Sequence, residues 1–174
     1  MYNYKTTPDV LPVFIEKKNV ELFKKHHIFT ETEIQSRYEI LLENYTKTLR
    51  IEARTLVDMV TKQFLPALAD TIDRSVTLAN KKKELSEKIS VKADKAIVEK
   101  LSKSYDAVYD KVTKLAADIV KADKITDELK LAKYYEGEIL KEMSAIREVA
   151  DEAEVLIPKD ILPYPSYADM LFYV

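Results

Sequence analysis

Apolar residues recur at every third or fourth position between residues 34 and 64, a spacing that places them on one face of a helix. The members of this first row are Ile34, Tyr38, Leu41, Tyr45, Leu49, Ala53, Leu56, Val60 and Phe64. A second row, which consists of Ile40, Leu42, Ile51, Val57 and Met59, widens the same face. Thr30 and Glu33 have the spacing of a capping box at the start of the helix. A helix with so broad an apolar face must be covered by something.

The apolar pattern continues beyond Pro66 and predicts a long helix over residues 31–87. A proline inside a helix removes one backbone hydrogen bond and clashes with the carbonyl four residues earlier. The immediate return of the pattern at Leu68, Ile72 and Val76 favours a continuous helix that kinks near residue 66. A broken helix with a turn near Leu65 is the alternative.

Two further rows with steps of three and four predict helices over residues 91–123 and 126–157, with Ser90 and Thr126 as caps. The first consists of Ile97, Leu101, Tyr105, Val108, Val112, Leu115 and Ile119. The second consists of Leu129, Ala132, Glu136, Ile139, Met143, Ile146, Ala150, Ala153 and Ile157. Two such helices joined by a short connection form an antiparallel hairpin. Gly137, inside the second helix, indicates close helix packing or a local irregularity.

The two ends of the chain contain most of the prolines. Residues 1–13 read as an extended lead-in, and residues 14–26 as a short helix. Residues 158–174 read as a tail, because three prolines prevent a regular helix and the aromatic residues there need an apolar surface. The whole pattern predicts an all-α fold in a single helical domain over residues 1–174. The long kinked helix and the hairpin form a three-to-four-helix bundle within it.

The predicted helix lengths leave part of the long helix without a partner. At about 1.5 Å per residue the long helix spans roughly 85 Å, and each hairpin helix spans roughly 48 Å. A simple hairpin then covers the half of the long helix that follows Pro66. The apolar face from Ile34 to Leu56 is left to the short first helix, to the C-terminal tail or to something outside this chain, and a face of that size left uncovered marks a binding surface. Together with the tail, this face supplies the interface candidates, which are Ile34, Tyr38, Leu41, Tyr45, Leu49, Tyr164, Tyr167, Leu171 and Phe172.

Composition excludes several classes of protein. With 28 basic and 30 acidic residues the net charge is −2, which favours neither nucleic acid nor a membrane surface as a partner. No apolar run approaches the roughly 18 residues that a membrane span requires. The chain has no cysteine, and its start has no apolar segment typical of a signal peptide. We therefore expect a cytoplasmic protein.

The residue types that carry chemistry are scarce. The two histidines, His26 and His27, are adjacent at a helix end, so they cannot chelate a metal as an i, i+4 pair does. The acidic group near Glu148 and the lysines from Lys81 to Lys83 read as solvated faces. Glu136 is a candidate for a buried carboxylate, with a structural role favoured over a catalytic one. We predict no catalytic, cofactor-binding or metal-binding residue in this chain.

Several short segments, in order along the whole chain, resemble the C-terminal region of type III glutamine synthetases. They are Leu11-Pro12, Phe29-Thr30 before Glu33, Ser36-Arg37-Tyr38-Glu39, Ile51-Glu52-Ala53, Leu65-Pro66-Ala67, and Pro163-Tyr164-Pro165-Ser166-Tyr167 before Leu171-Phe172. That family joins ammonia to glutamate with ATP and a divalent metal such as Mg²⁺, and forms ring-based oligomers. The resemblance places all of its catalytic motifs upstream of this region.

The resemblance implies a non-catalytic helical domain of a longer enzyme of nitrogen metabolism. Its expected partners are the upstream catalytic domain of the same polypeptide and further copies in a homo-oligomer. ATP and the metal belong to the parent enzyme, a glutamate–ammonia ligase, and not to this chain. The alternative is a stand-alone helical-bundle module that binds a partner helix through the same apolar face.

Overall fold

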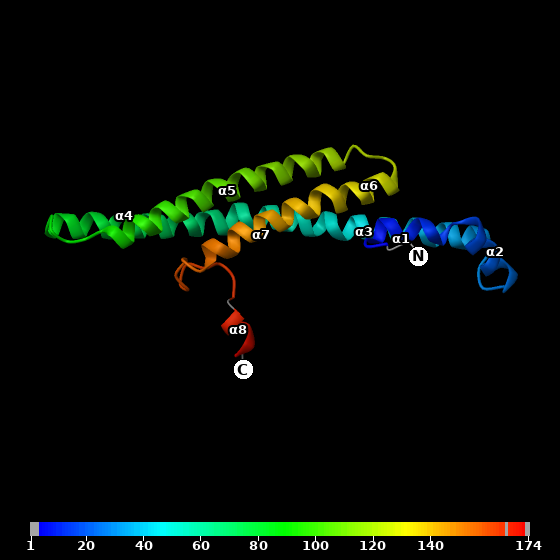
Figure 1. Cartoon of the computed structure of the whole chain (residues 1–174), viewed down its shortest axis with the longest axis horizontal. Coiled ribbons are helices and arrows are strands. Elements are labelled where there is room, and N and C mark those ends of the chain that lie inside the picture. The colour runs from blue at the N-terminus through cyan, green and yellow to red at the C-terminus, as the bar shows by residue number, and fades with distance from the viewer. Residues whose placement is uncertain (1–3, 166, 173–174) are drawn as a thin grey trace. The chain divides into compact units, whose positions relative to one another are not determined.

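The computed structural model describes residues 4–165 and 167–172, and within these ranges the regular structure is helical throughout (Figure 1). This confirms the predicted all-α class. The helices are α1 (Thr7–Phe14), α2 (Lys17–Lys25), α3 (Glu31–Met59), the π-helix η1 (Val60–Phe64), α4 (Leu65–Leu85), α5 (Lys92–Ala122), α6 (Glu128–Tyr134), the π-helix η2 (Tyr135–Ile139), α7 (Leu140–Glu154) and α8 (Tyr167–Leu171).

The chain divides into two compact units, and each is discontinuous in sequence. Unit 1 consists of Met1–Arg54 and Ala116–Lys141, and unit 2 consists of Thr55–Leu115 and Glu142–Val174. Each unit therefore combines a part of the long helical stretch with a part of the hairpin. The sequence, by contrast, predicts one domain. Each unit is described separately below.

The helix caps follow the local sequence closely. At the start of α3 the Glu33 carboxylate accepts from the Thr30 amide at 2.7 Å, and the Thr30 hydroxyl accepts from the Glu33 amide at 3.3 Å. This confirms the capping box. The Ser90 hydroxyl accepts from the Lys92 amide at 3.4 Å. At α6 the cap is Asp127 rather than the predicted Thr126, and its carboxylate accepts from the Lys130 amide at 2.8 Å.

The backbone remains helical through Pro66, so the alternative of a break near Leu65 is wrong. The irregularity is the π-helix η1, where the Leu65 amide bonds to the Val60 carbonyl five residues earlier. Pro66 then falls in the first turn of α4, where a missing backbone donor costs little. The changed hydrogen-bond register just before the proline is what allows the helix to continue.

In unit 1 the first half of α3 is covered by segments distant in sequence. Tyr38, Leu42 and Ala132 form a buried cluster, with Leu11 and Ile15 packed against it. Leu11 belongs to α1, so the predicted extended lead-in over residues 1–13 is wrong. Pro8 lies in the first turn of α1, a favoured position, and Pro12 lies within the helix.

The connection between α5 and α6 explains why the length argument failed. Asp123 is bonded to Arg50 and Arg54 on α3, while Ala132 packs against Tyr38 and Leu42, nearer the start of α3. Residues 123 and 124 form a turn, and residues 125–127 lie outside any helix. The segment 123–127 therefore continues along α3 beyond the end of α5, from Arg50 and Arg54 toward Tyr38.

In unit 2 the helices α4, α5 and α7 are joined by ion pairs and bury the predicted rows. The Lys82 ammonium lies 2.8 Å from the Asp94 carboxylate and joins α4 to α5, and Lys114 pairs with Glu142 and joins α5 to α7. The buried apolar residues of this unit include Val60, Phe64, Leu68, Leu101, Val108, Leu115, Ile146 and Ala153.

Gly137 lies in η2, which confirms a local irregularity. A β-carbon built on Gly137 would meet no atom within 4 Å, so the helix does not pack closely against a neighbour there. The π-helix instead shifts the register of the second hairpin row. Tyr135 becomes fully buried, and Glu136 is half-buried.

Candidate docking surface

The candidates on α3 have a different environment from the predicted one. Ile34, Tyr38 and Leu49 are buried by the chain itself, with exposed fractions of 8% or less. Tyr45 is half-buried, and Leu41 is 47% exposed. The interpretation of this row as an uncovered face is therefore wrong for the three buried residues. A contact of Leu41 or Tyr45 with another domain stays a prediction.

Tyr164, in the tail, is fixed to its own chain in unit 2. Its hydroxyl donates to the carbonyl of Met59 at 3.2 Å, directly before η1. Its ring stacks on Phe64, the last residue of η1, with centroids 6.5 Å apart and planes 13° apart. Burial raises the pKa of the Tyr164 phenol, and the negative charge of Glu154 adds to this effect. Tyr164 is thus an internal anchor, rather than the outward contact that the sequence suggests.

Two ion pairs hold the same tail. Arg74 on α4 lies 2.8 Å from the Asp160 carboxylate, and its hydrogen bond lowers the pKa of that carboxyl. Lys159 pairs with Asp169 and so ties the start of the tail to α8. The amides of Ile161 and Leu162 bond to the Pro158 carbonyl at 2.9 and 3.0 Å and close a turn. We refer to residues 158–165 as the strap.

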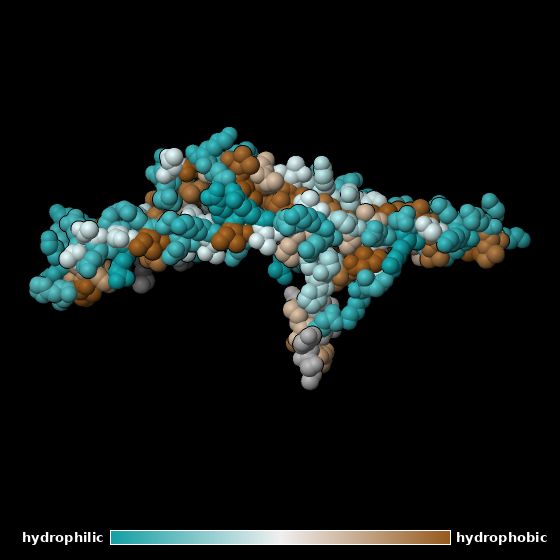
Figure 2. Space-filling view, turned by 180° about the vertical axis from the view of Figure 1, so that it is seen from behind, coloured by the Kyte–Doolittle hydropathy of each residue, from teal (hydrophilic) through white to brown (hydrophobic). Residues whose placement is uncertain are grey.

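The residues that follow the strap present apolar side chains to solvent. Met170 and Leu171, at the end of α8, are exposed, the latter to 76%, and Phe172 is exposed to 80%. We refer to residues 167–172 as the hook (Figure 1, red ribbon), which carries hydrophobic colouring beside the grey residues in Figure 2. The backbone of Tyr167 belongs to α8, but its side chain lies outside the described part of the structure.

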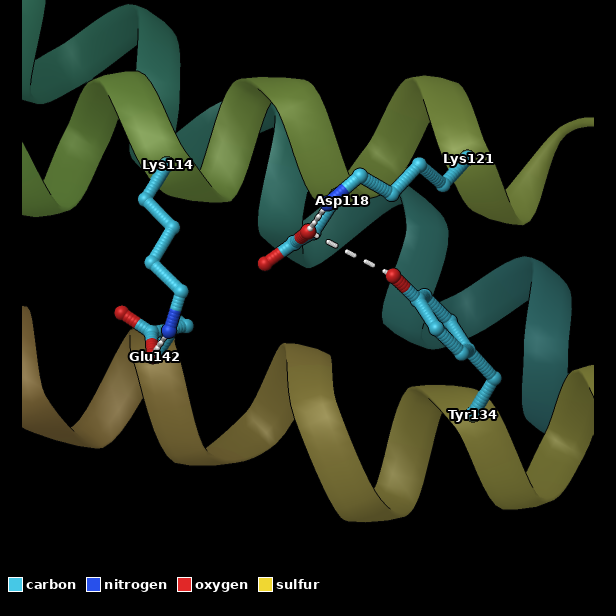
Figure 3. A network of polar contacts seen from close by, with 5 residues as sticks. All are labelled: Lys114, Asp118, Lys121, Tyr134 and Glu142. Atoms are coloured by element: carbon cyan, nitrogen blue, oxygen red, sulfur yellow. Dashed lines mark hydrogen bonds and ion pairs between the residues drawn. The ribbon is translucent and has the colours of Figure 1, made fainter.

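The buried acidic groups have structural partners (Figure 3). In unit 1 the Asp118 carboxylate, on α5, accepts from Lys121 at 2.7 Å and from the Tyr134 hydroxyl at 3.4 Å. The hydrogen bond to Asp118 raises the pKa of Lys121, and burial raises the pKa of Tyr134. In unit 2 the half-buried Glu142 pairs with Lys114. The contacts of Tyr134 with Asp118 and of Glu142 with Lys114 escaped sequence reasoning because the partners are remote in sequence.

No group of three metal-ligating side chains suited to a metal ion occurs among the described residues. In the same part of the chain, no helix has the length and apolar character to cross a membrane.

The fold and the tail contacts define a helical domain that exposes the apolar side chains of Met170, Leu171 and Phe172. Residues 1–83 match the family model described as glutamine synthetase C-terminal domain. The chain is 40% identical over 98% of its length to a glutamine synthetase of Butyrivibrio fibrisolvens and 27% identical, also over 98%, to the type-3 glutamine synthetase of Dictyostelium discoideum. A glutamine synthetase of Bacteroides fragilis is 25% identical over 95% of the chain. The chain is therefore similar to the glutamine synthetase C-terminal domain over residues 1–83 and to glutamine synthetases over nearly its whole length. It spans about a quarter of the length of each relative.

Proposed function

We propose that this chain is the non-catalytic helical part of a glutamine synthetase of the type III class, which packs on the catalytic part and supports assembly of a homo-oligomer. The parent enzyme forms glutamine from glutamate, ammonia and ATP with a divalent metal such as Mg²⁺, as part of nitrogen metabolism in the cytoplasm. The family match and the relatives' names support this assignment.

The exposed hook, held in place by the strap, carries the proposal. A loose terminal segment that exposes apolar residues would need no explanation, but this one is fixed by Tyr164, Asp160 and Asp169. Full burial of a side chain such as Leu171 or Phe172 contributes about 1.5–3 kcal/mol. Phenylalanine and methionine, the residue types of Phe172 and Met170, are enriched at the cores of protein interfaces.

The occupant that we assign to the hook is an apolar groove on the remaining part of the same enzyme. About three quarters of each relative's length lies outside the region that matches this chain. That length is large enough to form the catalytic part of the enzyme. A surface that is apolar in one domain and buried by its neighbour is what a domain within a larger assembly requires.

The test uses the natural gene product. Its reading frame is expected to extend well upstream of Tyr2, and a frame limited to these residues would overturn the proposal in favour of a stand-alone interaction module. In the full-length protein, the double variant Leu171→Asp/Phe172→Asp is expected to abolish the oligomer and reduce glutamine formation. Light scattering after size-exclusion chromatography measures the oligomer.

Val155→Asp is the control for this experiment, because Val155 is also in unit 2 and is 83% exposed but lies in the turn directly after α7, outside the hook. It replaces an exposed apolar residue by a carboxylate outside the hook, with one added charge instead of two, and is expected to leave assembly unchanged. Wild-type assembly and activity in the hook variant would contradict the proposal.

A further inference from the structure

We propose that the strap is a preorganising clamp, in which Tyr164 and the Arg74–Asp160 pair set the affinity of the hook for its partner without touching that partner. This inference rests on the proposed function, since it concerns the same docking surface. It assigns Tyr164 and Asp160 as positioning residues, a role distinct from that of the hook residues Leu171 and Phe172.

The contacts divide the tail into an inner anchored part and an outer exposed part. The Tyr164 ring is fixed between its hydrogen bond to Met59 and its stacking on Phe64, and Phe64 itself is buried. Only the short step through residues 165 and 166 separates Tyr164 from α8. A displacement of Tyr164 would therefore be transmitted to the hook.

The restricted backbone around Tyr164 supports the coupling of its position to that of the hook. Pro163 and Pro165 flank Tyr164, and each proline fixes its own φ angle and restricts the residue before it to extended backbone. The Lys159–Asp169 pair closes the segment from the other side. The hook is thus tied to the strap by an ion pair, and the strap is tied to the rest of unit 2 by Tyr164 and Asp160.

Preorganisation of the hook changes its affinity for the partner by an amount that follows from the fraction of molecules in the binding conformation. If only a fraction of the molecules hold the hook in the binding conformation, the apparent dissociation constant rises by the inverse of that fraction. Loss of the Tyr164 anchor releases several backbone and side-chain torsions that binding must then order again. We expect Tyr164→Ala to weaken assembly about three- to tenfold. Tyr164→Phe keeps the stacked ring and should weaken it about two- to threefold.

The experiment measures the concentration dependence of assembly for the full-length gene product by light scattering. Tyr164→Ala, Tyr164→Phe and Asp160→Asn are compared with Tyr109→Ala, which removes an exposed tyrosine of unit 2 far from the strap in sequence. Hydrogen exchange of residues 167–172 is expected to accelerate in Tyr164→Ala but not in Tyr109→Ala. If Tyr164→Ala does not fold, the Tyr164→Phe and Asp160→Asn variants carry the test.

A double-mutant cycle separates positioning from general stability. In the Leu171→Ala background, where assembly is weakened but still measurable, Tyr164→Ala is expected to have a smaller further effect on assembly, because part of the hook contact through which it acts is already lost. An equal effect in both backgrounds would overturn the inference. Normal assembly of Tyr164→Ala, together with defective assembly of the Leu171→Asp/Phe172→Asp hook variant, would also overturn the inference, but it would leave the proposed function intact. Normal assembly of the hook variant itself overturns both.

Discussion

The first half of α3 and the C-terminal hook both contain apolar residues that need a cover, but the structure buries most of the first set and exposes the second. Both are rows of aliphatic and aromatic side chains without an obvious partner in the sequence. The row on α3 is largely buried in unit 1, where Leu42 is 1% exposed, whereas Leu171 and Phe172 of unit 2 face solvent. An apolar row therefore indicates that a cover is needed, but not whether the chain itself supplies the cover.

The difference lies in the segments that can reach each row. On α3 the cover comes from α1 and α6, which are brought there by the turn after α2 and the connection 123–127. In the tail, Tyr164 already occupies the neighbouring surface at Phe64, and the prolines around it prevent the hook from folding back as a continuation of a helix.

The largest predicted effect is a difference in the loss of stability between a substitution at a buried residue and one at an exposed residue. Leu42→Ala should destabilise the chain by about 2–5 kcal/mol, because it leaves a cavity beside Tyr38 and Ala132. Leu171→Ala should change stability by less than about 0.5 kcal/mol. Urea unfolding followed by circular dichroism measures both. Equal effects of the two substitutions would remove the distinction between the two rows.

A second prediction concerns Tyr135, which is 1% exposed and whose hydroxyl has no hydrogen-bond partner within the described residues. Burial raises the pKa of this phenol. Tyr135→Phe removes a buried unsatisfied group while keeping the ring, and should stabilise unit 1 by about 1 kcal/mol. Thermal unfolding measures this change. A marked loss of stability would mean that the hydroxyl has a partner, such as a buried water.

The capping box gives a third prediction of similar or smaller size. Thr30→Ala removes the hydroxyl that accepts from the Glu33 amide and should cost about 1 kcal/mol. Thr32→Ala, an exposed substitution two residues later, is the matched control and should be nearly neutral. Urea midpoints of the two variants measure the difference, and equal midpoints would show that the cap contributes nothing.

The smallest effect is a pH dependence at the same cap. The hydrogen bond from the Thr30 amide lowers the pKa of the Glu33 carboxyl below its ordinary value. A lowered folded-state pKa gives stability that is present above the unfolded-state pKa and is lost as the pH falls through the folded value. Wild type should therefore exceed Glu33→Ala in stability at neutral pH, and the gap should close in acid. A gap independent of pH would exclude an ionic contribution.

Much of the fold follows from local pattern, and most of the errors concern distant contacts. The Thr30–Glu33 spacing and the hairpin rows predict helix starts and buried faces, because those depend on neighbouring residues. The helix α1, the π-helices and the pair of Asp118 with Tyr134 depend on tertiary packing. For the docking surface, the sequence predicts a tail of aromatic and aliphatic residues that includes Leu171 and Phe172. It does not reveal that Tyr164 turns inward to Met59.

The most direct measurement places a photo-reactive phenylalanine analogue at position 172 of the full-length gene product and identifies its cross-links by mass spectrometry. The same analogue at position 155 is the control. We predict that the probe at 172 cross-links to residues upstream of this chain, whereas the probe at 155 does not. Cross-links from position 172 confined to residues 1–174 would contradict the docking of the hook on the rest of the enzyme.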